Sequence, residues 1–193
     1  MFKSGGYVVG NTALLVIDAQ VGIIEGPEIG PVFKKEELLA KMKTVIDEAR
    51  EKSIPVIYIV DTDVAEPDTM EYQVHPHLAP LKDDTVITKK ATDAFYQTSL
   101  NDYLDTLNID HLVVIGCKTE FCVDTTCRRA TTSGYDVTLV ADAHSTTDNK
   151  VLSASQIIDH HNANLDGLDN INHFILVRNS SENIFEHKHL EYK

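Results

Sequence analysis

Short apolar runs alternate along this chain with longer stretches in which apolar residues recur every three or four positions. The runs are mostly continuous and rich in β-branched residues, which is typical of strands buried on both faces of a parallel sheet. They are TALLVIDA at 12–19, VIYIVD at 56–61, TVITK at 85–89, LVVI at 112–115, DVTLVA at 136–141 and FILV at 174–177. Each run therefore predicts a strand.

The longer stretches predict helices between these strands. Residues 34–52 place five apolar side chains on one helical face, and further helices are expected over 100–107, after Thr119 and over 152–165. We therefore predict an α/β fold with three αβα layers around a doubly wound, mostly parallel sheet of about six strands. No linker or repeat divides the chain, so 1–193 is expected to be a single domain, ending in an exposed polar tail.

The stretch at 112–129, LVVIGCKTEFCVDTTCRR, combines a strand, a glycine turn and the start of a helix. Thr119 is expected to cap this helix, with Glu120 and Cys122 in its first turn. Unpaired N–H groups and the helix dipole favour a thiolate there, so Cys122 is a candidate nucleophile. The alternative is a small buried core residue, the more common role of a free cysteine.

Two other polar residues are predicted at the same edge of the sheet as Cys122. Asp18 and Lys89 each end a predicted strand, and the carboxyl ends of parallel strands share one edge, where α/β sheets bind ligands. A carboxylate can take the proton of a thiol, a lysine can hold both anions, and the thiolate can attack a carbonyl. A solvated loop residue or a helix cap is the alternative reading of Asp18.

A long loop at 62–84 contains His75 and His77, and loops of this length often wall a functional site. A metal site with Asp61 or Asp63 is one interpretation. Two loop histidines beside a proline turn is the other, and we favour it because zinc sites need three or four convergent ligands.

Composition narrows the classes of function. The chain has 193 residues, 42% of them apolar, and a net charge of −13, which argues against nucleic acid or an anionic membrane as a partner. Its three cysteines lie too close together for a disulfide framework and lack zinc spacing, so we expect a reducing, cytoplasmic location. Residues 1–10 show no signal-peptide pattern, no apolar run has transmembrane length, and no GxGxxG follows the first strand.

Several motifs together resemble the isochorismatase-like cysteine hydrolases, a family that includes nicotinamidases and other small-amide hydrolases. The similarity runs from about Thr12 to Phe185. It rests on LLVIDAQ, HPHLAPL, VITK followed by Phe95 and Thr98, LVVIGCKTEFCVDTT, GYDVTLVADA and IIDHHN.

The resemblance implies a site and an assembly. It places a catalytic triad on Asp18, Lys89 and Cys122, a cis peptide bond at Cys117–Lys118, and an oxyanion hole on the backbone N–H groups of Lys118 and Cys122. It also suggests a homodimer or homotetramer. We further expect substrate contacts from Gln20, Phe95 and Thr119, although Phe95 fits the core at least as well.

The sequence also departs from the nicotinamidase branch of this family. That branch carries a metal-binding Asp-x-His, whereas this chain has Asp61-Thr62-Asp63. We therefore expect no metal or other cofactor, and a small-molecule substrate other than nicotinamide. Cys122 favours hydrolysis of the C–N bond of a small carboxamide through a thioester. An isochorismatase that cleaves a vinyl ether, or a non-catalytic, redox-sensing member of the fold, are the alternatives.

Overall fold

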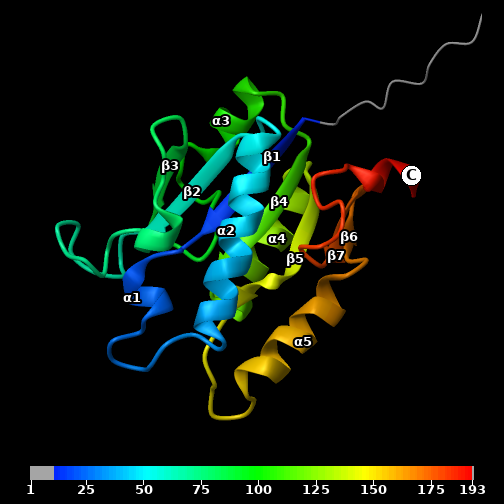
Figure 1. The fold of residues 1–193 in the computed structure, drawn as a ribbon. Coiled ribbons are helices and arrows are strands. Elements are labelled where there is room, and N and C mark those ends of the chain that lie inside the picture. Colours follow the sequence, from blue (N-terminus) through cyan, green and yellow to red (C-terminus); the bar gives the residue numbers. More distant parts are fainter. Residues whose placement is uncertain (1–10, 193) are drawn as a thin grey trace, which may run out of the picture.

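The computed structural model describes residues 11–192, which form one central sheet with helices on both faces (Figure 1). Residues 1–10 and 193, over which the predicted domain also extends, lie outside the described part. In chain order the elements are β1 (Thr12–Ile17), α1 (Val21–Ile24), α2 (Lys35–Glu51), β2 (Val56–Asp61), a 3₁₀ turn (Pro76–Leu78), β3 (Thr85–Lys89), α3 (Leu100–Thr106), β4 (His111–Cys117), a π-helical turn (Thr119–Val123), α4 (Asp124–Thr132), β5 (Asp136–Ser145), α5 (Ala154–Leu165), β6 (Asp169–Asn170), β7 (His173–Arg178) and a 3₁₀ turn (Lys188–Glu191).

The sheet has seven strands in the order β3-β2-β1-β4-β5-β7-β6. Neighbouring strands are parallel, except that β6 pairs antiparallel with β7. The predicted three-layer, mostly parallel α/β fold is confirmed, with one strand more than expected. The extra strand, β6, has two polar residues, too few to produce an apolar pattern in the sequence.

The chain changes direction across the sheet at β1, which lies between β2 and β4. The first half of the chain builds the sheet on one side of β1, and the second half builds it on the other. Ile17, the last residue of β1, pairs with Ile59 of β2 and with Gly116 of β4. In doubly wound sheets such a reversal opens a crevice outside the carboxyl ends of the strands, where ligands bind.

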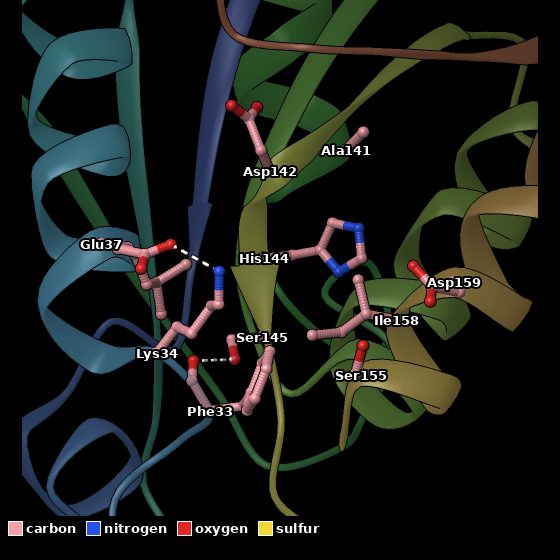
Figure 2. A pocket seen from close by; sticks show the side chains of 11 residues that line it. Phe33, Lys34, Glu37, Ala141, Asp142, His144, Ser145, Ser155, Ile158 and Asp159 are labelled. Carbon is pink, nitrogen blue, oxygen red and sulfur yellow. Dashed lines mark hydrogen bonds and ion pairs between the residues drawn. The ribbon is translucent and has the colours of Figure 1, made fainter. Parts of the chain in front are cut away.

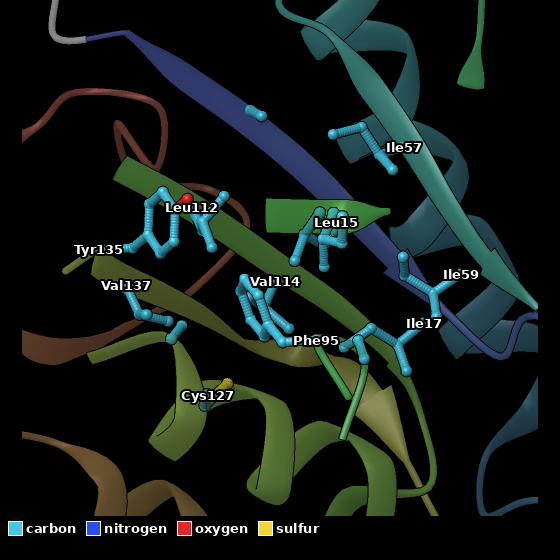
Figure 3. Close-up of a cluster of buried hydrophobic side chains, with 14 of the residues drawn as sticks. Leu15, Ile17, Ile57, Ile59, Phe95, Leu112, Val114, Cys127, Tyr135 and Val137 are labelled. Carbon is cyan, nitrogen blue, oxygen red and sulfur yellow. The ribbon is translucent and has the colours of Figure 1, made fainter. Parts of the chain in front are cut away.

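Two hydrophobic clusters hold the layers together, and β1 contributes to both because successive side chains of a strand point to opposite faces. Leu14 and Val16 pack in the cluster that includes the apolar face of α2. Leu15 and Ile17 pack with residues of α3 and α4 in the other cluster (Figure 3). All six residues of β1 are buried, which explains why its sequence is continuously apolar.

The segment after β7 is not the exposed polar tail that the sequence predicts. Ile184 and Phe185 are buried in the same cluster as α2, and His187 and His189 are buried as well. Two apolar residues are too few to give a periodic signal, and histidine reads as polar in a hydropathy pattern. This segment nevertheless covers part of the sheet.

None of the helices in the described part of the chain is both long enough and apolar enough to cross a membrane.

Gly116 allows β4 to approach β1 closely beside the crevice. Its φ is +133°, and a Cβ there would lie 2.0 Å from the carbonyl oxygen of Ile17. The Gly116→Ala substitution is expected to lower the free energy of unfolding by at least about 3 kcal/mol, because the clash is with backbone that cannot move aside. Denaturant unfolding followed by circular dichroism measures this change.

Gly134 provides the control for this substitution. Its φ of +97° is also positive, but a Cβ there meets no atom within 4 Å. Gly134→Ala should therefore cost only about 1 kcal/mol, the conformational strain alone. Equal losses in the two variants would show that the close contact with Ile17 does not matter.

Candidate active site

Three side chains from distant parts of the chain meet at the crevice. Asp18 follows β1, Lys89 is the last residue of β3, and Cys122 lies in the π-helical turn after β4. Asp18 has a φ of +46°, an uncommon conformation that aspartate tolerates better than most residues. The peptide bond between Cys117 and Lys118, where the chain leaves β4, is cis.

The ammonium of Lys89 lies at the centre of this group. Its Nζ is 2.9 Å from Oδ2 of Asp18 and 3.3 Å from Sγ of Cys122. A carboxylate oxygen of Asp18 and Sγ of Cys122 also lie within 4.8 Å of each other. The strand β3 is separated from β1 by β2, so the lysine reaches the other two residues across the end of β2 with its long side chain.

A fourth residue, Asp61, completes the group. It ends β2 directly beside Lys89 in the parallel register, and its Oδ2 lies 2.6 Å from the Lys89 Nζ. In the sequence, Asp61 stands out only as a possible metal ligand. Its role as a second counterion for the lysine could have been found from its position at the end of the neighbouring strand.

Gln20 holds Asp61 in place rather than pointing toward a ligand. Its Nε2 donates to the carbonyl oxygens of Asp61 at 3.0 Å and Tyr72 at 2.9 Å, and its Oε1 accepts the backbone N–H of Asp61 at 2.9 Å. The side chain is fully buried, and both hydrogens of its amide are used. The expected substrate contact is therefore replaced by a positioning role.

Burial and charge set the protonation states of Asp18 and Lys89. Burial raises the pKa of the Asp18 carboxyl to about 6, although the adjacent Lys89 ammonium acts in the opposite direction. Burial acts against the charge of Lys89, but its contacts with Asp18 and Asp61 outweigh this and raise its pKa above the usual value. At neutral pH the site therefore contains an ammonium and an ionised Asp18 that is close to its titration range.

Cys122 rests as a thiol, in contrast to the thiolate expected from its place at the start of a helix. Burial raises the pKa of its thiol to about 12, with a further contribution from the Asp18 carboxylate, and the Lys89 ammonium only partly compensates. The dipole of a short helical turn is a weaker influence than the loss of solvation. Activation of this sulfur therefore requires a base that takes its proton, and Asp18 is adjacent.

The helical turn that carries Cys122 is held by a buried hydrogen-bond network that no pattern in the sequence indicates. Thr119 does not cap the helix, because Lys118 occupies the cap position and makes no side-chain capping bond. The Thr119 hydroxyl instead lies 2.9 Å from Nδ1 of His144. Nε2 of His144 lies 2.8 Å from Oδ1 of Asn162, and Nδ2 of Asn162 donates to the carbonyl of Ala141.

These contacts determine every donor in the network. Nδ2 of Asn162 faces a carbonyl, so Oδ1 of Asn162 accepts from Nε2–H of His144, and Nδ1 of His144 accepts from the Thr119 hydroxyl. Burial lowers the pKa of His144 to about 4, which keeps the ring neutral. Thr119, an expected substrate contact, is buried and used in this network. A polar residue near the end of β5 was the only sequence signal for His144.

Phe95 belongs to the core. It is buried in the same cluster as Cys122, and its ring stacks on that of Tyr135 at a centroid distance of 5.7 Å. Of the two readings that the sequence left open, packing is the one that its position supports.

The positions of His75 and His77 favour the interpretation that they are two loop histidines beside a proline turn and not metal ligands. His75 is buried and contacts Oε1 of Glu25 at 3.2 Å, while His77 is exposed. Within residues 11–192, the groups of side chains that are arranged as metal ligands contain neither of them.

A cavity of about 280 Å³ lies near the same edge, between the start of α2, the end of β5 and the start of α5 (Figure 2). His144 and Ser145 form one wall, Phe33 and Lys34 lie at the α2 side, and Ile158 lies on α5. His144 connects this cavity to Thr119, and so to the turn that carries Cys122.

Comparisons with known proteins identify the family of this chain. The family model described as "Isochorismatase domain" matches residues 12–170, which include Asp18, Lys89 and Cys122. This chain belongs to the isochorismatase family. The three-layer fold described above is accordingly the fold of this hydrolase family.

Individual relatives show the same assignment. The chain is 29% identical to the uncharacterized isochorismatase family protein YddQ of Bacillus subtilis, over 76% of this chain and 87% of that protein. It is 31% identical to a streptothricin hydrolase of Streptomyces noursei over 70% of this chain, but this match spans only half the length of that relative. A crystal structure of an isochorismatase from Pseudomonas putida superposes with a TM-score of 0.80, at 30% identity, covering 93% of each chain.

The three cysteines should differ in reactivity. Cys117 and Cys127 have no exposed surface, whereas Cys122 is 9% exposed. Limiting iodoacetamide should therefore modify Cys122 first, slowly at neutral pH because of its raised pKa. Trypsin separates Cys117 from a peptide over 119–128 that contains the other two, and fragment spectra of that peptide distinguish them. Labelling of the unfolded chain, where all three react, is the control; first labelling of Cys117 or Cys127 would contradict the geometry.

Proposed function

We propose that this isochorismatase-family protein hydrolyses the C–N bond of a small carboxamide through a thioester on Cys122. The observation that carries the proposal is the buried ammonium of Lys89, which contacts both the Asp18 carboxylate and the Cys122 sulfur. This arrangement supplies a nucleophile, a base within reach and a fixed positive charge.

In the first half of the proposed reaction, Asp18 takes the thiol proton while Sγ of Cys122 attacks the carbonyl carbon of the amide. The carbonyl oxygen becomes an oxyanion, for which the backbone N–H groups of Lys118 and Cys122 are the candidate donors. The intermediate then collapses: the C–N bond breaks, the departing nitrogen takes the proton from Asp18, and the amine leaves.

In the second half, water replaces the amine. Asp18, ionised again, takes a proton from this water as its oxygen attacks the thioester carbonyl. The C–S bond breaks, the proton on Asp18 returns to the sulfur, and a carboxylic acid is released. The cycle consumes one water and restores the starting state, and no redox step is involved.

The position of Lys89 supports the proposal that the reaction needs no metal. Asp18, Asp61 and Cys122 are arranged as three metal ligands. The Lys89 ammonium lies within 3.3 Å of all three side chains, at 2.9, 2.6 and 3.3 Å. The lysine cation would compete with a metal ion for these three side chains, which supports the proposal of a reaction without a metal.

The streptothricin hydrolase relative supports hydrolysis as the reaction class. The identity of the substrate is best sought with a panel of small amides and release of ammonia or amine as the readout. A vinyl ether hydrolase would not require the thiol of Cys122, and a redox-sensing protein would turn over none of these compounds.

The Cys122→Ala and Asp18→Asn variants should each lower kcat/KM for the substrate found by at least about 10³-fold, because one removes the nucleophile and the other its base. Cys127→Ala is the matched control: it also removes a buried thiol nearby, but not one in contact with Lys89, and should retain activity. Mass spectrometry of a slow reaction should find an acyl adduct on the peptide over 119–128. Full activity in Cys122→Ala would disprove covalent catalysis.

The pH dependence should report Asp18. Its carboxyl must be ionised to act as the base, and its pKa is raised to about 6. The value of kcat/KM should therefore be constant above this pH and fall about tenfold per unit below it. Initial rates between pH 4.5 and 9 measure this profile. A rate that instead rises between pH 7 and 9 would indicate that a preformed thiolate is the reactive species.

A further inference from the structure

A second group of buried titratable side chains lies at the opposite edge of the sheet from Cys122. Asp136 begins β5, and His187 and His189 come from the segment that follows β7. Each of these residues offers one atom of a kind that can bind a metal ion, and the three atoms lie within 4.8 Å of one another. All three residues are buried, so they form an interior cluster and not a solvated acidic patch.

One ring nitrogen of His189 has no hydrogen-bond partner within residues 11–192. Its Nε2 lies 2.8 Å from the carbonyl oxygen of Val137, and since a carbonyl cannot donate, Nε2 carries the hydrogen. Nδ1 therefore holds a lone pair, and it is buried with no hydrogen-bond partner in the part of the chain that the structure describes. A neutral imidazole whose N–H is fixed by a backbone carbonyl is the usual form of a histidine metal ligand.

His187 and Asp136 supply the other two atoms that could bind a metal ion. Nε2 of His187 lies 2.7 Å from Oδ2 of Asp136, while Oδ1 of Asp136 accepts the backbone N–H of Phe174 at 3.2 Å. Nδ1 of His187 is buried and lies 3.5 Å from Oδ1 of Asp110. In the other tautomer of His187 the hydrogen is on Nδ1, where it can be donated to Asp110 in a hydrogen bond. Nε2 then has a lone pair that can bind a metal, as Nδ1 of His189 does.

The neighbouring histidines have different roles. His111 stacks on His187 at 4.7 Å, but its two nitrogens already contact the hydroxyls of Thr12 and Thr138 at 3.0 and 2.8 Å. It therefore packs against the cluster and is not available as a ligand. Nδ1 of His173 lies 3.5 Å from Oδ1 of Asp136, but His173 does not belong to the group whose ligand atoms all lie within 4.8 Å of one another.

We propose that this cluster is a structural site for a divalent transition metal, with zinc as the most suitable ion. The ligands are Oδ2 of Asp136, Nε2 of His187 and Nδ1 of His189, and a water takes the fourth position. Zinc accepts such imidazole and carboxylate donors in tetrahedral geometry at about 2.0–2.2 Å. Donor atoms around it are then roughly 3.3 Å apart, so the 2.7 Å between His187 and Asp136 has to open slightly.

The metal would add a further connection between the segment after β7 and strand β5, which already meet through the contacts of His187 with Asp136 and of His189 with Val137. Asp136 stands on a central strand, and both histidines stand on the segment that carries Ile184 and Phe185 into the cluster of α2. An ion bound only by the folded chain stabilises it by mass action. The site lies away from Asp18, Lys89 and Cys122, and its loss should affect stability and not chemistry.

The test uses the full chain in a Cys122→Ala background, because the sulfur at the other edge could also bind zinc. After EDTA treatment and dialysis against zinc, elemental analysis should find one ion per chain. Zinc in 100-fold excess over its dissociation constant should raise the melting temperature by about 5–10 °C. The His187→Gln/His189→Gln variant should bind zinc at least 10-fold more weakly and lose this shift.

A control variant shows whether zinc binding depends on these particular histidines, and a diffraction measurement locates the ion directly. His77→Gln/His160→Gln removes two exposed histidines and should leave zinc binding and the shift unchanged. If the cluster variant does not fold, anomalous scattering at the zinc edge from crystals of the Cys122→Ala protein should place the ion beside Asp136. No bound zinc, an ion located elsewhere, or equal binding by both double variants would overturn the proposal and leave the cluster as a hydrogen-bonded contact only.

Discussion

The buried ammonium of Lys89 is the interaction around which the crevice is built. Removing a charge from water costs several kcal/mol, and the cost is tolerated only where opposite charges and hydrogen bonds replace the solvent. Asp18 and Asp61 supply those charges at 2.9 and 2.6 Å. Each of the three residues ends or directly follows a different strand of the sheet, so their convergence depends on the register of β1, β2 and β3. The polar site and the order of the strands therefore stabilise each other.

Backbone geometry at the crevice is equally specific. The close approach of Gly116 to Ile17 and the positive φ of Asp18 bring the ends of β4 and β1 together. Gln20 then ties this part of the chain to Asp61 with two hydrogen bonds and to Tyr72 with a third. Conformations of this kind persist only where the surrounding contacts enforce them. The buried strands of the core provide that support, because every residue of β1 and β4 is buried.

The sequence predicts the elements and the meeting of Asp18, Lys89 and Cys122 because both follow from simple periodicity: apolar runs mark strands, and parallel strands end at one edge. Contacts between side chains that are distant in the chain leave no such pattern. The bond from Thr119 to His144, the clamp of Gln20 on Asp61, and the burial of the last segment all depend on packing that appears only in three dimensions. The raised pKa of Cys122 belongs to the same class, since desolvation depends on every neighbour. The expected dimer or tetramer stays a prediction.

The resting state of Cys122 becomes understandable when the charges of the site are considered together. One ammonium and two carboxylates give the buried group one net negative charge while the sulfur is a thiol. A resting thiolate would add a second negative charge where there is little water to solvate it, which is why burial and Asp18 raise the pKa of this thiol. Transfer of the proton to Asp18 during attack avoids that cost, since the negative charge lost at the carboxylate reappears on the oxyanion. The net charge of the site then stays constant through the proposed cycle, and each step only moves charge between groups that are already positioned to hold it.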